Sequence, residues 1–166
     1  MKLLNTRTSL LVALAAVILV PLCSRAQQPA TPGYGAPIKL EQAKQIVAAA
    51  DAEARKNGWS VAISVVDAGG HLVLLQRLDD TQIGSIEISR QKAVSAVHFR
   101  RPTKAFADLL AGGGEGLRVL KVEGAVPIDG GLPIVKDGKI IGGVGVSGVQ
   151  PGQDAQVAVA GLAALK

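Results

Sequence analysis

His71 is one of two histidines in the sequence, and it stands where a strand is predicted to begin. Strand alternation places its side chain on the same face as Val73, Leu75 and Arg77. An imidazole and a guanidinium on a partly apolar face suit an anionic planar ligand, because guanidinium groups pair with carboxylates and imidazole nitrogens ligate metals. The alternative is a strand-end histidine that bonds only the backbone of the preceding turn.

His98 falls in the last turn of a helix that is predicted over 83–99 and is followed by Arg100 and Arg101. Cations at a helix C-terminus complement the helix dipole. His98 is therefore interpreted either as a capping cation or as a second candidate ligand.

Basic side chains gather in the sequence around the end of that helix and the start of the next one. Thr103 is predicted to cap the following helix through its hydroxyl group. Free backbone N–H groups and positive charge there could bind carboxylates or phosphate, and a solvated surface cluster is the alternative. The basic residues are Lys92, Arg100, Arg101 and Lys104.

Carboxylates offer a different chemistry, because a carboxylate beside a bound substrate can act as a general base. Asp67, Asp79 and Glu87 are the candidates, with Arg77 as a clamp for the carboxylate of a small organic acid. Turn and helix-start preferences explain these acidic residues equally well. The chain has no G-x-S-x-G or H-E-x-x-H motif, and two histidines fall short of the three ligands of a catalytic zinc.

Residues 143–148 match the dinucleotide-binding pattern G-x-G-x-x-G. That motif requires a parallel strand followed by a helix, whereas this segment belongs to a predicted hairpin. The preferred interpretation is that its small residues allow a helix to pack closely over the strand.

The composition places the chain among globular proteins, with 48% hydrophobic and 19% charged residues. Its four aromatic residues are too few for a stacking surface for single-stranded nucleic acid. The net charge of +5 falls to +2 without residues 1–26, because 15 of the 18 basic residues remain against 13 acidic ones. A basic footprint for nucleic acid is therefore not expected.

Residues 1–26 are predicted to be a signal peptide. Lys2 and Arg7 precede an apolar run of eleven residues over 10–20, and Ser24-Arg25-Ala26 provides a cleavage site. The run is shorter than the ~20 residues that span a bilayer, although a signal anchor is the alternative. We expect cleavage after Ala26, removal of the lone Cys23, no membrane span in the mature protein, and a periplasmic or secreted location.

The proline- and glycine-rich segment 27–37 is predicted to be a flexible linker, followed by a single domain over 38–166. Helical and alternating periodicities predict the order helix, hairpin, two helices, hairpin and helix. This order indicates an α+β domain with an antiparallel sheet flanked by helices. The elements are expected at 39–57, 59–67 with 71–77, 83–99, 104–110, 132–136 with 139–147, and 151–165, with a mobile glycine-rich loop at 112–116.

An ordered set of motifs covers nearly all of 38–165 and resembles the GlcG/HbpS-like family, which includes the C-terminal domain of PduO. The motifs are SVVDAGGHLV at 64–73, RPT at 101–103, GGLPI at 130–134 and GVSG at 145–148. The resemblance implies a profilin-like or PAS-like fold, assembly into dimers or larger oligomers, and haem or another tetrapyrrole as ligand. It also implies a partner such as a sensor protein.

The leading hypothesis is an exported haem-binding protein, a sensor or scavenger, that binds its ligand rather than catalysing a reaction. His71 is preferred over His98 as iron ligand, because a second positive centre beside ferric iron is unfavourable near Arg100 and Arg101. The residues assigned to the haem site are His71, His98, Arg77, Lys92, Arg100, Arg101 and Thr103. The alternatives are an enzyme for a small organic acid and a cofactor-free oligomeric interaction module. Self-association is expected through strand 139–147 and the alanine-rich helices.

Overall fold

The computed structural model describes residues 30–165. Residues 31–165 belong to one compact unit, and the predicted signal peptide at 1–26 lies outside the described residues. Within the described part of the chain, none of the helices combines the length and apolar character that a membrane crossing requires.

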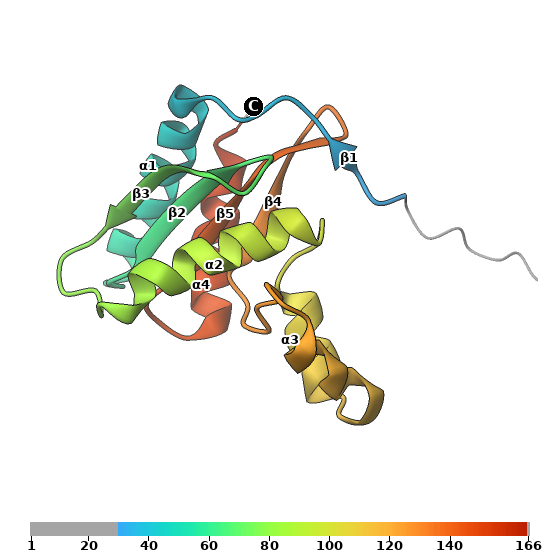
Figure 1. The fold of residues 1–166 in the computed structure, drawn as a ribbon. Coiled ribbons are helices and arrows are strands. Elements are labelled where there is room, and N and C mark those ends of the chain that lie inside the picture. Colours follow the sequence, from blue (N-terminus) through green and yellow to red (C-terminus); the bar gives the residue numbers. More distant parts are fainter. Residues whose placement is uncertain (1–29, 166) are drawn as a thin grey trace, which may run out of the picture. The chain divides into compact units, whose positions relative to one another are not determined.

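A five-stranded sheet forms the centre of the domain (Figure 1). The long strand β5 pairs antiparallel with β2 on one side and with β4 on the other, and β3 pairs antiparallel with β2. The two-residue strand β1 pairs with the beginning of β5 in a parallel register. The strands are β1 (Gly33–Tyr34), β2 (Ala62–Asp67), β3 (Leu72–Arg77), β4 (Gly131–Lys136) and β5 (Lys139–Ser147).

Helices cover both faces of this sheet (Figure 1). The side chains of β2 point alternately to the two faces, and they are buried on both. Ile63 and Val65 pack with helices α1 (Leu40–Lys56) and α4 (Pro151–Ala163), whereas Val66 packs with α2 (Gly84–His98). The predicted α+β class, with an antiparallel sheet flanked by helices, is confirmed.

The glycines of β5 allow α2 to approach the sheet closely. A Cβ atom at Gly145 would lie 2.0 Å from the Ser89 carbonyl oxygen, and one at Gly143 would lie 2.6 Å from the Ala93 carbonyl oxygen. The interpretation of the G-x-G-x-x-G match as a packing motif is therefore confirmed. The hairpin predicted at Asp137-Gly138 is also confirmed, with positive φ values of 50° and 70° at the two turn residues.

Two connecting segments differ from the sequence-based expectations. Part of the segment predicted as a flexible linker, 27–37, is attached to the sheet, because β1 pairs with β5 and the Gly35 N–H donates to the Ile140 carbonyl. The glycine-rich segment after helix α3 (Lys104–Ala111) continues as the 3-10 helix η1 (Gly114–Lys121) instead of a loop. A strand pairing of two residues and a 3-10 helix leave little hydrophobic periodicity in the sequence, so the sequence pattern did not predict them.

Candidate functional site

The turn between β2 and β3 is organised by the side chain of Asp67. Its Oδ1 accepts hydrogen bonds from the Gly69 N–H at 2.8 Å and the His71 N–H at 2.9 Å, and its carbonyl accepts from the Gly70 N–H at 3.0 Å. Partial burial opposes ionisation, but the two backbone N–H donors and the nearby His71 outweigh it and lower the pKa of Asp67. Asp67 is therefore an ionised structural carboxylate and a poor general base.

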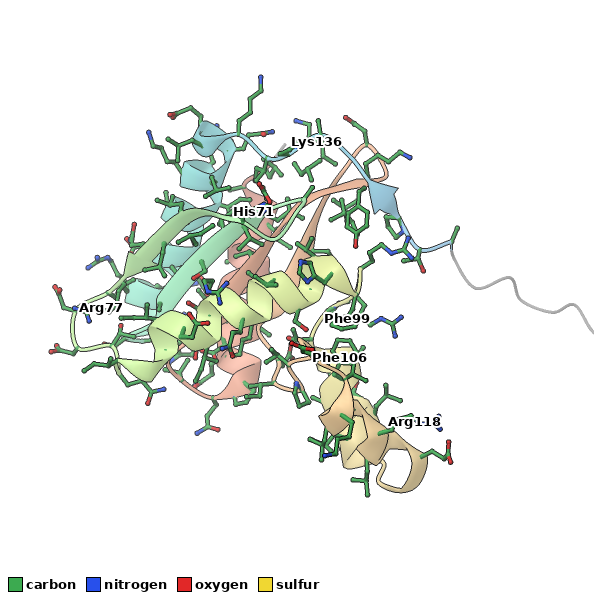
Figure 2. The ribbon with its side chains drawn as sticks, in the orientation of Figure 1. His71, Arg77, Phe99, Phe106, Arg118 and Lys136 are labelled. Atoms are coloured by element: carbon green, nitrogen blue, oxygen red, sulfur yellow. The ribbon has the colours of Figure 1, made fainter. Side chains whose placement is uncertain are left out.

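The His71 imidazole stands at the end of this turn and is directed to solvent (Figure 2). Its Nδ1 lies 3.3 Å from Asp67 Oδ1, and its side chain is 83% exposed. A carboxylate beside one ring nitrogen fixes the ring and the tautomer and leaves the other nitrogen for a metal, as in many metal-ligating histidines. The ring therefore pairs with a carboxylate, and not with the turn backbone as the sequence-based alternative proposed.

His98 lies against the other side of the same turn. Its Nε2 is 3.3 Å from the Gly69 carbonyl oxygen, which can only accept a hydrogen bond, so Nε2 carries the proton in this contact. Gly70 has a φ of +86°, and a Cβ atom there would lie 2.6 Å from His98 Nε2. The fold thus brings both histidines to one turn, but the Nε2 of His98 is occupied by the backbone.

Tyr34 joins the C-terminal end of α2 to β1. Its hydroxyl group lies 3.0 Å from the Val97 carbonyl oxygen and 3.2 Å from the His98 carbonyl oxygen, and it donates to this pair of acceptors. The Arg100 guanidinium lies 5.9 Å from the centroid of the Tyr34 ring, within the range of a cation–π contact. Tyr34 was assigned to the linker from sequence, so its contact with the candidate site was missed.

Arg100 ends helix α2 in the left-handed backbone conformation, with a φ of 52°. The Arg100 N–H donates to the Val97 carbonyl and the Arg101 N–H to the Ala96 carbonyl, which is the pattern of a Schellman cap. Glycine usually occupies this position, and a side chain there is strained. The cap therefore places the Arg100 side chain two residues after His98, at a position where glycine would make the end of the helix more stable.

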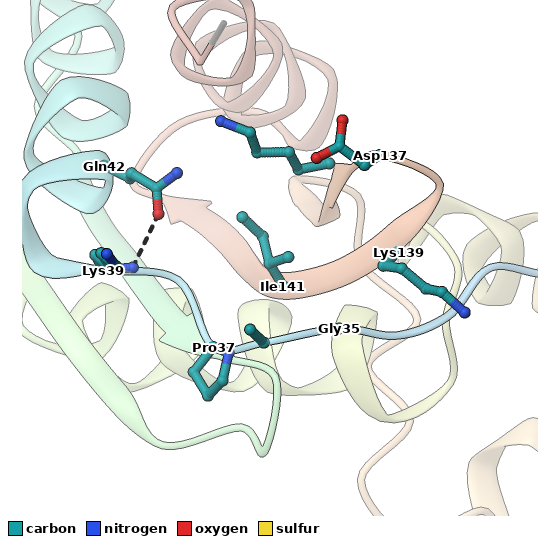
Figure 3. Close-up of a pocket in the computed structure, with 9 residues that line it drawn as sticks. Gly35, Pro37, Lys39, Gln42, Asp137, Lys139 and Ile141 are labelled. Carbon is teal, nitrogen blue, oxygen red and sulfur yellow. Dashed lines mark hydrogen bonds between the residues drawn. The ribbon is translucent and has the colours of Figure 1, made fainter.

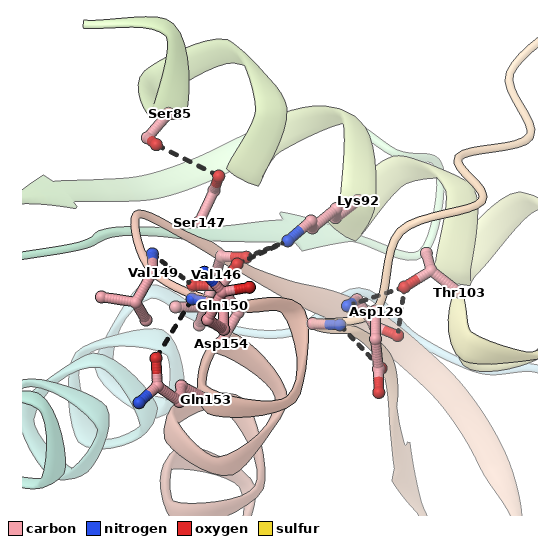
Figure 4. Close-up of polar contacts among 12 residues, drawn as sticks. Ser85, Lys92, Thr103, Asp129, Val146, Ser147, Val149, Gln150, Gln153 and Asp154 are labelled. Atoms are coloured by element: carbon pink, nitrogen blue, oxygen red, sulfur yellow. Dashed lines mark hydrogen bonds and ion pairs between the residues drawn. The ribbon is translucent and has the colours of Figure 1, made fainter. Parts of the chain in front are cut away.

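Lys92 is not part of an exposed basic cluster, so its assignment to a haem site is corrected (Figure 4). Its side chain is 1% exposed, and its Nζ donates to Asp154 Oδ2 at 2.8 Å and to the Val146 carbonyl at 2.9 Å. Burial raises the pKa of the Asp154 carboxyl, although the hydrogen bond and charge of Lys92 act in the opposite direction. Close packing of α2 on β5 draws this lysine into the interior.

Thr103 is also buried, and the prediction that its hydroxyl caps α3 is wrong. It occupies the position before the helix, but its Oγ1 accepts from the Gly131 N–H at 3.0 Å and lies 3.4 Å from the Gly131 carbonyl oxygen. Lys104 forms an exposed ion pair with Asp108 at 2.6 Å. Arg101 lies over the ring of Phe106, so the residues expected as one basic cluster point to four different surroundings.

Arg77 does not lie near His71. His71 directly precedes β3 and Arg77 is its last residue (Figure 2), so the two are about 20 Å apart at ~3.3 Å per residue. The predicted pairing of a His71 imidazole with an Arg77 guanidinium around one ligand is therefore corrected. Arg100 is linked to the turn through Tyr34, because its guanidinium lies over the Tyr34 ring and the Tyr34 hydroxyl group donates to the His98 carbonyl.

Glu87, another of the three carboxylates considered as a general base, is 53% exposed and is held by Arg90. The Arg90 Nη2 donates to Glu87 Oε1 at 2.6 Å, and this hydrogen bond lowers the pKa of Glu87. In the part of the chain that the structure describes, no group of three or more His, Cys, Asp or Glu side chains is placed to hold a metal ion.

A separate cationic pocket of about 290 Å³ lies between the start of α1 and the β4–β5 turn (Figure 3). Ile141 is among its lining residues. Gln42 and Lys39 also line the pocket, and the Gln42 side-chain oxygen accepts a hydrogen bond from the Lys39 N–H at 3.0 Å. Three lysines line it: Lys39, Lys136 and Lys139. Both histidines lie at the β2–β3 turn and not among the residues that line this pocket.

Removing Lys92 is expected to destabilise the domain strongly. Lys92→Ala leaves the buried Asp154 carboxylate without its partner, which typically costs about 3–5 kcal/mol of unfolding free energy. The paired change Lys92→Met with Asp154→Leu removes both charges, and it is expected to recover most of this loss. Urea denaturation measures both variants; an unaltered midpoint for Lys92→Ala would show that the pair contributes nothing. Lys104→Ala, which breaks an exposed pair, is the control expected to match the unaltered protein.

A sheet covered by helices on both faces, with two imidazoles beside one exposed turn, defines a small α+β domain with a candidate ligand site at the edge of the sheet. Residues 38–163 match the family described as haem degrading protein HbpS-like, and the chain belongs to that family.

Individual relatives support this assignment. The protein GlcG of Escherichia coli strain K12 is 44% identical over 110 residues, which cover 66% of this chain and 81% of GlcG. The crystal structure of Klebsiella pneumoniae protein ORFY aligns with a TM-score of 0.73 and 32% identity, over 87% of this chain and 97% of ORFY. The crystal structure of a PduOC–haem complex aligns with a TM-score of 0.71 and 30% identity, over 78% of this chain and 96% of PduOC.

Proposed function

We propose that this protein binds haem at the β2–β3 turn and that His71 supplies an axial ligand to the iron. The observation that carries the proposal is the Asp67–His71 pair, in which the carboxylate lies 3.3 Å from Nδ1 and the exposed ring offers Nε2. A haem-bound relative of 30% identity supports the choice of ligand.

The side chains around the turn fit a haem group. Val73 and Leu75 are half-buried on β3; Val73 packs against the hydrophobic core, and Leu75 would offer apolar surface to a porphyrin. Arg100 replaces Arg77 as the proposed partner of a propionate, because it lies beside His98 and is directed over Tyr34. Bound haem would supply an iron centre with a further coordination position, and the chain itself would bind and orient that group.

A haemin titration tests this proposal. We expect a Soret band that shifts and saturates at one haem per chain. Absence of a saturable band between neutral and alkaline pH would contradict the haem proposal.

We also propose that the protein is exported and acts outside the cytoplasm as a haem sensor or scavenger. The proposal rests on the charged end, the apolar run and the small-residue site in residues 1–26. N-terminal sequencing of the exported protein is expected to begin at Gln27. A membrane-bound product that keeps residues 1–26 would contradict cleavage and support an anchor.

A further inference from the structure

The cationic pocket between the start of α1 and the β4–β5 turn is held in shape by backbone contacts. The Gly35 N–H donates to the Ile140 carbonyl and the Ile38 N–H donates to the Ile141 carbonyl, each at 2.8 Å. These hydrogen bonds attach the segment before α1 to the beginning of β5. Glycine is needed at position 35, because a Cβ atom there would lie 2.8 Å from the Lys139 Cβ atom. The walls of the pocket are therefore fixed by the sheet.

Positive charge dominates the lining of this pocket. Three lysines are opposed by one acidic lining residue, Asp137, so the lining residues carry a net charge of +2. Within residues 30–165, neither Lys39 nor Lys139 takes part in an ion pair. The neighbouring Glu41 pairs with the Lys44 ammonium group at 2.8 Å and not with Lys39. Two of the three lysines are therefore available to an external anion.

Lys39 stands at a position where a lysine does not favour the fold. It is the N-cap residue of α1, where a side-chain oxygen usually accepts hydrogen bonds from the first N–H groups of the helix. An ammonium group has no acceptor, and the positive end of the helix dipole repels it. Lys136 and Lys139 bring further positive charge to the same pocket. A bound anion would relieve this repulsion, so its binding would stabilise the folded chain.

Gln42 adds a polar donor to the pocket. Its side-chain oxygen accepts from the Lys39 N–H at 3.0 Å, which leaves the amide nitrogen of the same side chain as a hydrogen-bond donor. Donors and positive charges thus surround a space of about 290 Å³, which is at the small end of ligand pockets. The space suits a small anion and is too small for a tetrapyrrole.

We propose that this pocket binds a small organic dianion with two carboxylate groups. Figure 3 shows Ile141 between Lys39 and Lys139, so an apolar side chain separates two cationic ones. A short dicarboxylate matches this order, because its carbon skeleton would cover Ile141 and each end would meet one ammonium group. Lys139 is exposed, and its flexible stem lets the ammonium group turn toward the ligand. Ala36 and Pro37 extend the apolar lining, which inorganic phosphate would leave uncovered.

Isothermal titration of the haem-free protein with succinate tests this proposal. We expect saturable binding of one succinate per chain, weakened by added sodium chloride because salt screens exposed charges. Butyrate has the same number of carbon atoms and one carboxylate, and it is expected to bind about tenfold more weakly or worse, since one charged contact is lost. No saturable succinate binding would overturn the proposal. Binding of butyrate or inorganic phosphate as tight as that of succinate would overturn the choice of a dicarboxylate.

Glutamine variants locate the site. Lys39→Gln and Lys139→Gln are each expected to raise the dissociation constant for succinate about tenfold or more, because each removes one charged contact. Lys121→Gln is the matched control, since Lys121 is exposed at the end of η1 and does not line the pocket. It makes the same change in net charge and is expected to bind succinate like the unaltered protein. All three lysines are exposed, and circular dichroism checks that the variants fold. Equal weakening in Lys121→Gln, or unaltered binding in both pocket variants, would overturn the proposed site.

Discussion

Replacing Gly145 with alanine is expected to lower the free energy of unfolding by about 3 kcal/mol, the upper end of the usual cost of overpacking. The added Cβ atom would lie 2.0 Å from the Ser89 carbonyl oxygen and 2.6 Å from the Ala93 nitrogen. Both are backbone atoms of α2, so no side-chain rotation relieves the overlap. The helix would have to move away from β5, which would also strain the buried Lys92–Asp154 pair.

Gly84→Ala is the matched control for this prediction. Gly84 begins α2, and a Cβ atom there would meet nothing within 4 Å. Its replacement is expected to leave stability unchanged or slightly raised, because alanine favours helix over glycine. Urea denaturation compares the two variants directly. Equal midpoints for Gly145→Ala and Gly84→Ala would contradict the close packing of α2 on β5.

Removing the His71 imidazole is expected to weaken haem binding more than tenfold and to change the Soret spectrum, since the ring ligates the iron in the proposed site. His71 stands in an exposed turn, so His71→Ala is expected to keep the fold. His98→Ala is expected to bind haem with a similar spectrum, because the Nε2 of His98 already contacts the Gly69 carbonyl. Titration of both variants with haemin separates their roles. A spectrum lost only in His98→Ala would reverse the assignment.

Periodicity in the sequence was sufficient to predict the main elements. The buried face of α1 consists of Ala43, Ile46, Val47, Ala50 and Ala54, and these apolar residues recur at helical spacing in the sequence. Asp137-Gly138 has the turn chemistry that fixes a hairpin. These signals depend only on neighbouring residues, so they can be recognised in the sequence without knowledge of the tertiary fold.

The candidate site was predicted less well, because its geometry depends on contacts between distant segments. Lys92 has the sequence context of a surface cation, and only the close approach of α2 to β5 explains why it is buried with Asp154, 62 residues away. Arg77 shares a strand face with His71 in the alternation pattern, but strand length separates the two. Tyr34 reaches the end of α2 through a strand of two residues, too short to produce a pattern.

The most direct test of the proposed haem site is chemical rescue of His71→Gly by free imidazole. This variant opens a space where the ring stood, and added imidazole can enter it and ligate the iron. We predict that haem-loaded His71→Gly has an altered Soret band and that millimolar imidazole returns it to the position seen in the unaltered protein. His98→Gly is predicted to have the unaltered spectrum from the start. If His71→Gly already shows the unaltered spectrum without imidazole, His71 does not ligate haem iron.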